Sequence, residues 1–106
     1  MYIISNNNLK SPELQASIIE PILLSSIDGI SFNFLLIIMQ KMSQIYSYEL
    51  KRYLFYLIDY GVISYDGPNK AYRIKNGGLG LLDMINKEKI QEKVDINNIT
   101  ITFEYQ

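Results

Sequence analysis

Tyrosines and basic residues gather in the middle of the chain, where seven of the nine tyrosines fall between positions 46 and 72. A phenol hydroxyl can donate a hydrogen bond to a phosphate, and an aromatic ring can contact a thymine methyl group. Lysine binds phosphate as a point charge, whereas the guanidinium fork of arginine matches the edge of guanine. These residue types therefore predict contacts with double-stranded DNA. The candidate contact residues are Tyr46, Ser47, Tyr48, Lys51, Arg52 and Tyr56 in one segment and Asn69, Lys70 and Arg73 in a second.

Not every residue of these segments is expected to reach a ligand. On a helix the adjacent Lys51 and Arg52 diverge by about 100°, so one can enter a groove while the other reaches the backbone, and we assign guanine to Arg52 and phosphate to Lys51. Tyr53 and Tyr72 are expected in the core, from helical spacing and strand alternation respectively. Two other interpretations stay open. The outward aromatic side chains could form a protein interface instead, and Asn69 could serve only its turn.

The residue inventory argues against enzymatic chemistry. The chain has no histidine and no cysteine, which removes the commonest general base, the commonest metal ligands and every disulfide. Glu88 and Glu92 are spaced as neighbours on a helix, but lysines surround them, which is typical of a solvated face. The glycines at 77, 78 and 80 lack the lysine of a phosphate-binding loop. We therefore expect no catalytic residue, no metal, no cofactor and no small-molecule ligand.

A capped helix followed by a hairpin is predicted for the segment that holds the candidate residues. Ser47 is a good N-cap residue, and Gly61 can adopt the left-handed conformation that ends a helix. The apolar runs 62–65 and 71–74 flank the turn-forming residues 66–69, as in a two-stranded hairpin. The buried stripe of the helix is expected at Leu50, Leu54, Leu57 and Ile58.

This segment resembles the archaeal winged helix-turn-helix family of small DNA-binding regulators. The resemblance rests on the pattern Ser-x-x-Leu-x-x-Tyr-Leu-x-x-Leu-x-x-x-Gly-Val-Ile, from 47 to 63, and on Tyr72-Arg73-Ile74 followed by Gly78-x-x-x-Leu82. It covers residues 11–89, closely in the third helix and wing and only in hydrophobic pattern before them. It implies a winged helix-turn-helix fold, a recognition helix at 47–60 in the major groove, a wing at 62–74 on the flank, and a transcription regulator that is commonly dimeric and needs no cofactor.

Three further helices are expected around this unit. The first begins near Ser11 and Pro12 and is kinked or split at Pro21. Ser31 caps the second, which ends near Met42. The fourth spans about 76–92, and its glycines are expected to permit close packing against another backbone. Its inner side is expected to carry Leu79, Leu82 and Ile85.

The two ends of the chain are expected to form strands. Apolar residues alternate with polar ones from Ile99 to Tyr105, which predicts a half-buried strand. A lone terminal strand is unstable, so it should pair with residues 1–5, within the chain or across a dimer. The predicted organisation is an N-terminal strand and loop at 1–10, the winged domain at 11–93 and a C-terminal strand at 94–106, in an α+β fold with four helices and a two-stranded wing.

The charges are divided unevenly along the sequence. Residues 41–75 hold six basic and three acidic side chains, a net +3, while the remainder carries a net −4, for a total of −1. Such a split suits a domain that meets a phosphate backbone with one surface. No apolar stretch approaches the ~18 residues of a membrane span. We therefore expect a cytoplasmic location and no membrane contact.

The sequence thus predicts sequence-specific binding to double-stranded DNA by a small homodimeric transcription regulator. A dimer is expected because two half-sites multiply a weak affinity and because surplus apolar residues such as Leu36 and Ile37 need cover. The substitution Arg52→Ala should relax base preference, whereas Lys70→Ala should weaken binding to all sequences alike. The alternative function is a winged-helix module for protein–protein contacts in a transcription or other assembly.

Overall fold

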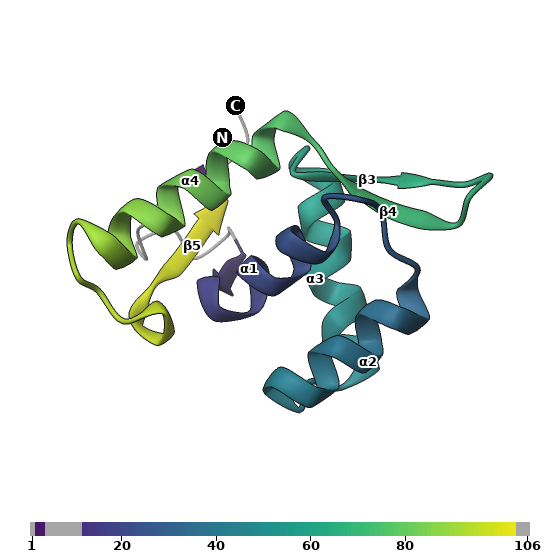
Figure 1. The fold of residues 1–106 in the computed structure, drawn as a ribbon, viewed down its shortest axis with the longest axis horizontal. Helices are drawn as coiled ribbons and strands as arrows, with labels where there is room; N and C mark the ends of the chain where they lie inside the picture. Colours follow the sequence, from purple (N-terminus) through teal and green to yellow (C-terminus); the bar gives the residue numbers. More distant parts are fainter. Residues whose placement is uncertain (1, 4–11, 104–106) are drawn as a thin grey trace.

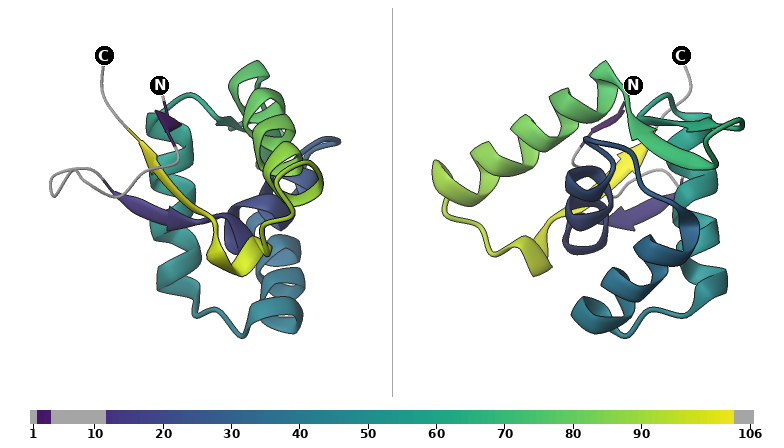
Figure 2. Two further views of the ribbon diagram at one scale, coloured as in Figure 1. Left: turned by 90° about the vertical axis from the view of Figure 1, so that its left-hand side faces the viewer. Right: turned by 45° about the vertical axis from the view of Figure 1, so that its right-hand side comes forward.

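A computed structural model describes residues 2–3 and 12–103, and these residues form an α+β domain with four α-helices. A β-hairpin follows the third helix directly and projects on the side opposite the loop between α4 and β5 (Figures 1 and 2). The α+β class and the hairpin are therefore confirmed. The elements are β1 (Tyr2–Ile3), β2 (Glu13–Gln15), α1 (Ala16–Ser25), α2 (Phe32–Ser43), α3 (Ser47–Asp59), β3 (Ile63–Asp66), β4 (Ala71–Ile74), α4 (Asn76–Ile90), the 3-10 helix η1 (Ile96–Asn98) and β5 (Thr100–Phe103).

A three-stranded antiparallel sheet of order β1-β5-β2 joins the two ends of the chain. Tyr2 pairs with Phe103, so the predicted pairing of the terminal strands occurs within one chain. Leu14 pairs with Ile101 at the other edge, where the sequence had suggested a helix instead. The middle strand β5 is more deeply covered than alternation predicted, because Thr102 is buried along with Ile101 and Phe103.

The first helix begins at Ala16, which corrects the predicted start, while Ser11 itself lies outside the described residues. The backbone N–H groups at the start of this helix donate to residues far away in the sequence. The Gln15 N–H donates to the phenol oxygen of Tyr53 at 3.0 Å, and the Ala16 N–H donates to the Ile99 carbonyl at 3.0 Å. These contacts hold the chain extended up to residue 15, because a paired backbone group is costly to release.

The structure tests what was predicted for Pro21 in α1 and for the start of α2. α1 continues through Pro21 as one helix, so of the two predicted outcomes, a kink or a split, the split does not occur, and Pro21 is buried. α2 begins as predicted, with the Ser31 hydroxyl oxygen accepting a hydrogen bond from the Phe34 N–H at 3.3 Å. Of the surplus apolar residues of α2, Leu36 packs against the core, whereas Ile37 is exposed.

One hydrophobic core joins the helices to the sheet. The Tyr60 ring, just after α3, stacks on Phe103 of β5 with 4.8 Å between ring centroids. Ile58 lies outside this core, contrary to expectation, and Tyr53 takes its place on the inner side of α3. Buried core residues include Ile19, Ile22 and Leu23 of α1, Leu35 and Met39 of α2, Leu50, Leu54 and Leu57 of α3, Leu81 and Ile85 of α4, and Leu14 and Ile101 of the sheet.

The junction between α3 and the hairpin is a glycine-dependent turn. Gly61 has a φ of +75°, the left-handed conformation predicted for it. The Val62 N–H donates to the Leu57 carbonyl at 2.8 Å and the Gly61 N–H donates to the Ile58 carbonyl at 3.0 Å, which together form a Schellman motif. This motif sets the direction in which β3 leaves the helix.

α4 begins against the same junction. A Cβ at Gly77 would lie 2.9 Å from the carbonyl oxygen of Gly61, and one at Gly78 would lie 2.5 Å from that of Val62. The glycines therefore permit the close backbone packing that the sequence predicted. Of the predicted inner side, Ile85 is buried and Leu82 packs against the core, as expected. Leu79 is 50% exposed, which corrects its placement, and Leu81 is buried instead, one turn after the inward-facing Gly78.

The helices of the described residues are too short or too polar to cross a membrane.

Candidate nucleic-acid interface

The outer surface of α3 exposes three large aromatic side chains at its start and middle. Tyr46, Tyr48 and Phe55 are 65%, 68% and 63% exposed. The Tyr46 and Tyr48 rings stack on each other with 5.7 Å between centroids and 9° between planes. Tyr46 is the N-cap residue, so Ser47 is the first residue of the helix rather than its cap, and no side chain caps this end. The backbone donors of the first turn therefore stay available to a ligand.

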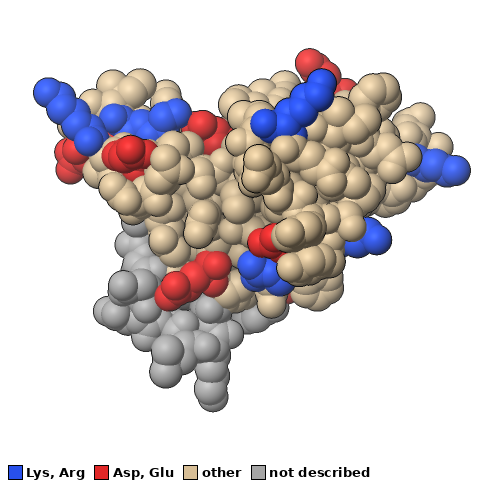
Figure 3. All heavy atoms as spheres, turned by 90° about the horizontal axis from the view of Figure 1, so that it is seen from below, with Lys and Arg blue, Asp and Glu red and all other residues tan. Residues whose placement is uncertain are grey.

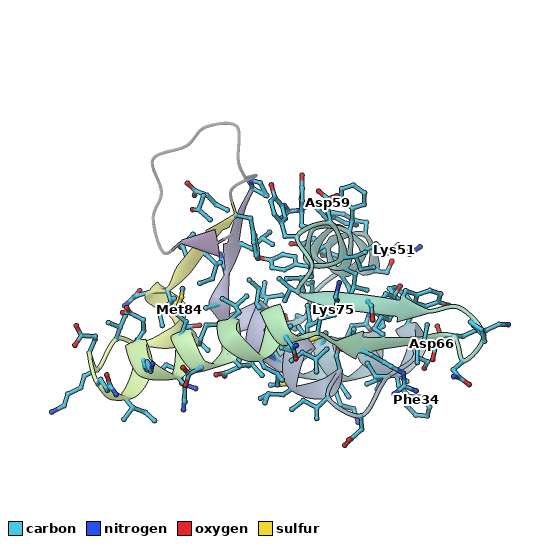
Figure 4. The ribbon with its side chains drawn as sticks, turned by 90° about the horizontal axis from the view of Figure 1, so that it is seen from above. Phe34, Lys51, Asp59, Asp66, Lys75 and Met84 are labelled. Carbon is cyan, nitrogen blue, oxygen red and sulfur yellow. The ribbon has the colours of Figure 1, made fainter. Side chains whose placement is uncertain are left out.

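The two basic residues of α3 point in different directions, as their adjacency predicted. The Lys51 ammonium lies 5.5 Å from the ring centroid of Phe32, the first residue of α2. The Arg52 guanidinium lies 5.3 Å from the ring centroid of Tyr53, in the same helix. Figure 4 shows Lys51 extending in the direction in which the hairpin projects, while Asp59 extends on the side of α3 that faces away from the hairpin. Arg52 precedes Asp59 by seven residues, two helical turns, and so shares its side.

The candidate residue Tyr56 does not share the exposure of its neighbours. It is half-buried and packs against the core, which corrects its predicted outward placement. Its ring meets that of Phe55 edge to face with 5.4 Å between centroids. Phe55 is thus the exposed aromatic residue at this level of the helix.

Tyr53 anchors the inner side of the same helix, as expected. It is 3% exposed, and its phenol oxygen accepts the Gln15 N–H described above. Burial raises the pKa of the Tyr53 phenol above its ordinary value, and the Gln15 N–H and the nearby Arg52 charge oppose this only in part. The outer residues of α3 are thereby fixed in orientation by a bond on the opposite side.

In the hairpin, three of the polar residues form a network around one carboxylate. Asp66 accepts hydrogen bonds from the Asn69 amide nitrogen at 2.7 Å, from the Asn69 backbone N–H at 3.3 Å and from Arg73 Nε at 3.3 Å. The Arg73 guanidinium also packs beside Gly29, where a Cβ would lie 2.9 Å from it. Asn69 and Arg73 therefore have partners within the chain, which favours the turn-forming role of Asn69.

The same network changes the protonation of Asp66. The side-chain and backbone hydrogen bonds from Asn69, with a smaller contribution from Arg73, hold the pKa of the Asp66 carboxyl below its ordinary value. The carboxylate is charged at neutral pH and offsets one of the basic residues of the hairpin. Lys70 stands at the tip with a φ of +51° and is exposed among the turn residues.

Tyr65 and Tyr72 form the paired aromatic surface of the hairpin. They are directly opposite each other on β3 and β4, and their ring centroids are 4.8 Å apart. Tyr72 is half-buried, and its backbone pairs with Ile30, which joins the hairpin to the segment before α2. Burial raises the pKa of the Tyr72 phenol, with a further increase from Tyr65. Tyr72 thus has the structural role that the sequence predicted.

Basic side chains do not form one continuous patch on the face of the molecule that Figure 3 draws. Figure 3 shows lysine and arginine side chains in separate groups, with uncharged residues between them. The net +3 of residues 41–75 is therefore spread over α2, α3 and the hairpin. The electrostatic attraction that one copy of the chain can exert on a phosphate backbone is modest.

Two residues of this surface escaped the sequence reasoning. Phe55 is not among the predicted contacts, although its place two turns after Tyr48 is a signal that the sequence contains. Asp66 was assigned only to the turn. An aspartate three residues before an asparagine is a recognisable turn signal, but its pairing with Arg73 depends on the hairpin register.

Comparison with protein-family models, with curated proteins and with solved structures gives no match to this chain.

Proposed function

We propose that this chain is a winged-helix domain that binds double-stranded DNA, with α3 in the major groove and the β3–β4 hairpin against the flanking backbone. The observation that carries the proposal is that Lys51 extends in the same direction as the hairpin. The Schellman motif at Gly61 sets the direction in which the hairpin leaves α3. A helix followed by a projecting hairpin can occupy a groove and the neighbouring backbone at once. The groove side of α3 then carries Ser47 and Lys51, four residues apart on one face.

The start of α2 supports the same placement of the duplex. Lys51 lies against Phe32, the first residue of α2, so its charge is close to the positive end of that helix dipole. A phosphate approaching this point would meet the lysine ammonium and the positive end of α2 together. Lys70 at the tip of the hairpin supplies a second phosphate contact, at the other end of the same side. Arg52 lies about 100° around the helix from Lys51, so it points away from the part of the backbone that Lys51 would meet.

A homodimer is the form in which we expect the domain to act. A modest surface charge predicts weak binding by one copy, and two linked half-sites multiply that affinity. The exposed Leu79 and Ile90 are eleven residues apart and so share one face of α4. Burial of these two side chains between copies would remove apolar surface from water. Sedimentation of the parent chain and of Ile90→Asp tests this, since a dimer held by α4 becomes a monomer in the variant.

The test of duplex binding is the salt dependence of affinity for a labelled random duplex. Fluorescence anisotropy between about 50 and 200 mM salt should give a binding constant that falls linearly on logarithmic axes. Lys51→Gln and Lys70→Gln should each reduce the slope by about 1, because each removes one phosphate contact. The matched control is Lys87→Gln, which removes an exposed lysine paired with Asp83 on α4. Equal slopes in all four proteins would refute the proposal.

A protein-interaction module is the second candidate, and the exposed apolar residues of α2 favour it. Phe34 is 67% exposed and Ile37 is 49% exposed, three residues apart on the outer face of that helix. Large apolar side chains on a helix face are typical of groove-binding partners. Affinity for duplex DNA that does not respond to salt, together with loss of a protein partner in Phe34→Ala, would favour this function over the first.

A further inference from the structure

A second surface of α3, which borders its hairpin side, consists of Tyr46, Tyr48, Arg52 and Phe55, and we call it the aromatic face. Phe55 lies one helical turn after Lys51 and one turn before Asp59, so it faces between the hairpin side and the side on which Asp59 extends (Figure 4). Tyr48 precedes Phe55 by seven residues and so lies on the same face. Three aromatic side chains that are each more than 60% exposed lie here within ten residues.

The composition of this face does not suit the grooves of a duplex. Phenylalanine has no hydrogen-bonding group, so in a major groove Phe55 could contact only a thymine methyl group. The Tyr46 and Tyr48 rings are nearly parallel, with 9° between planes, and they form a flat aromatic surface. The faces of paired bases are covered by their neighbours in the duplex stack. A flat aromatic surface therefore fits bases that are unpaired.

We infer that the aromatic face binds unpaired bases of DNA beside the duplex held by the hairpin side of α3. This inference rests on the proposed DNA binding. Charge selects the occupant, because Arg52 lies between Tyr48 and Phe55 along the helix and can meet the phosphates that link the stacked bases. The stretch from 50 to 58 contains no acidic side chain, and Asp59, on the same side as Arg52, lies one turn beyond Phe55 at the end of α3.

The spacing along the helix also fits a stack of bases. Seven residues span about 10 Å of helix axis between the levels of Tyr48 and Phe55. Successive bases of one strand are about 3.4 Å apart, so two bases fit between these levels. The stacked Tyr46 extends the surface beyond Tyr48 at the start of the helix. The protein should therefore prefer duplex DNA that contains a short unpaired region.

The experiment compares labelled DNA of one length as a perfect duplex and as the same duplex with a short central bubble of mismatched pairs. Fluorescence anisotropy should show at least about tenfold tighter binding to the bubble, the effect of one stacked base. Tyr48→Ala and Phe55→Ala should each remove most of this preference. Phe55→Ala, which removes no predicted duplex contact, should leave affinity for the perfect duplex unchanged. Tyr48→Phe should keep the preference, because the ring remains.

The matched control is Phe34→Ala, which removes an equally exposed phenylalanine from α2, on the far side of the hairpin from α3 in Figure 4. It should leave the preference for the bubble intact. The three substituted side chains, Tyr48, Phe55 and Phe34, are each more than 60% exposed, and circular dichroism confirms that each variant is folded. Sedimentation of each variant shows whether a substitution acts through the oligomeric state instead.

Each result has a definite meaning. Equal affinity for duplex and bubble would overturn the inference and leave duplex binding in place. Tight bubble binding without any duplex binding would support the aromatic face and overturn the proposed role of the hairpin side. A preference that survives in both Tyr48→Ala and Phe55→Ala would overturn the inference, and so would conversion of a dimer to monomers by either substitution, since the face would then join two copies.

Discussion

The hairpin and the outer surface of α3 are both rich in polar and aromatic residues, but they use them differently. In the hairpin, Arg73 and Asn69 are bound to Asp66. On α3, Lys51 and Arg52 contact only aromatic rings among the interactions found in the described residues, and their charges stay uncompensated. The two regions carry similar residue types in the sequence. The basic side chains of α3 are nonetheless more available to a binding partner than Arg73 of the hairpin.

The difference teaches that counting charges along the sequence overstates the positive field of the hairpin. Asp66 cancels one of its basic residues locally, so Lys70 is the principal free charge at its tip. The network also fixes the shape of the turn, which a flank-binding hairpin needs. We therefore expect α3 to supply most of the binding and the hairpin to supply position.

The largest expected effect, on the free energy of unfolding, comes from disturbing the junction between α3 and the hairpin, against which α4 begins. In Gly78→Ala the new Cβ would meet the Val62 carbonyl oxygen and the Ile74 side chain at 2.5 Å, so the start of α4 must move away from the hairpin. Alanine favours a helix by up to ~1 kcal/mol over glycine. Overpacking against backbone outweighs this, and we expect a net loss of about 2 kcal/mol in the free energy of unfolding.

Urea denaturation measures this change. The control is Gly67→Ala in the hairpin turn, where a Cβ would meet nothing within 4 Å. It should leave the free energy of unfolding within about 0.5 kcal/mol of the parent. If both variants had the parent stability, the close approach at Gly78 would not constrain the junction.

The second effect tests the anchor beneath the outer surface of α3. Tyr53→Phe removes the acceptor of the Gln15 N–H and should cost about 1 kcal/mol of stability at neutral pH. Because the pKa of Tyr53 is raised in the folded state, its favourable contribution is fully present below pH 10 and is lost as the pH rises through the folded value. The parent should therefore lose stability more steeply above pH 10 than Tyr53→Phe does.

Thermal melts from pH 7 to pH 11 measure both parts of this prediction. Tyr46→Phe is the control, because that phenol is 65% exposed and its removal should change neither value. Parallel alkaline profiles for the parent and Tyr53→Phe would show that the burial of this phenol does not contribute to stability.

These comparisons also show which features the sequence could predict. Local signals were sufficient for Ser31 as a cap, for Gly61 as a helix end and for the hairpin, because each depends on residues a few positions apart. The three-residue strand at 13–15 was missed because its partner, Thr100–Phe103, is far along the chain. A short segment takes its conformation from such non-local pairing rather than from its own propensity.

The candidate surface was predicted less completely for the same reason. Helical spacing indicated correctly that Lys51 and Arg52 diverge, but the side that faces the hairpin depends on how α3 packs on the core. Tyr56 shows this limit, since its position at the border of the helical stripe did not show which neighbours would cover it. Likewise, the pairing of Arg73 with Asp66 needed the cross-strand register.

The smallest expected effect comes from releasing the hairpin charge. Asp66→Asn keeps an oxygen that can accept the Asn69 N–H but loses the charge that holds Arg73. If the hairpin follows a phosphate backbone, the released Arg73 becomes one more phosphate contact, and the salt slope of duplex binding should increase by about 1. The variant would then bind DNA more tightly at low salt, because the hairpin, like α3, would present an unpaired arginine.

Acid stability gives an independent measure of the same substitution. The lowered pKa of Asp66 means that its contribution to stability is present above its unfolded value near 3.8 and is lost as the pH falls through the folded value. Asp66→Asn has no such group, so its melting temperature should fall less than that of the parent between pH 5 and pH 2. An unchanged salt slope with the altered acid profile would show that Arg73 serves the hairpin alone, and that DNA contacts come from α3 and Lys70.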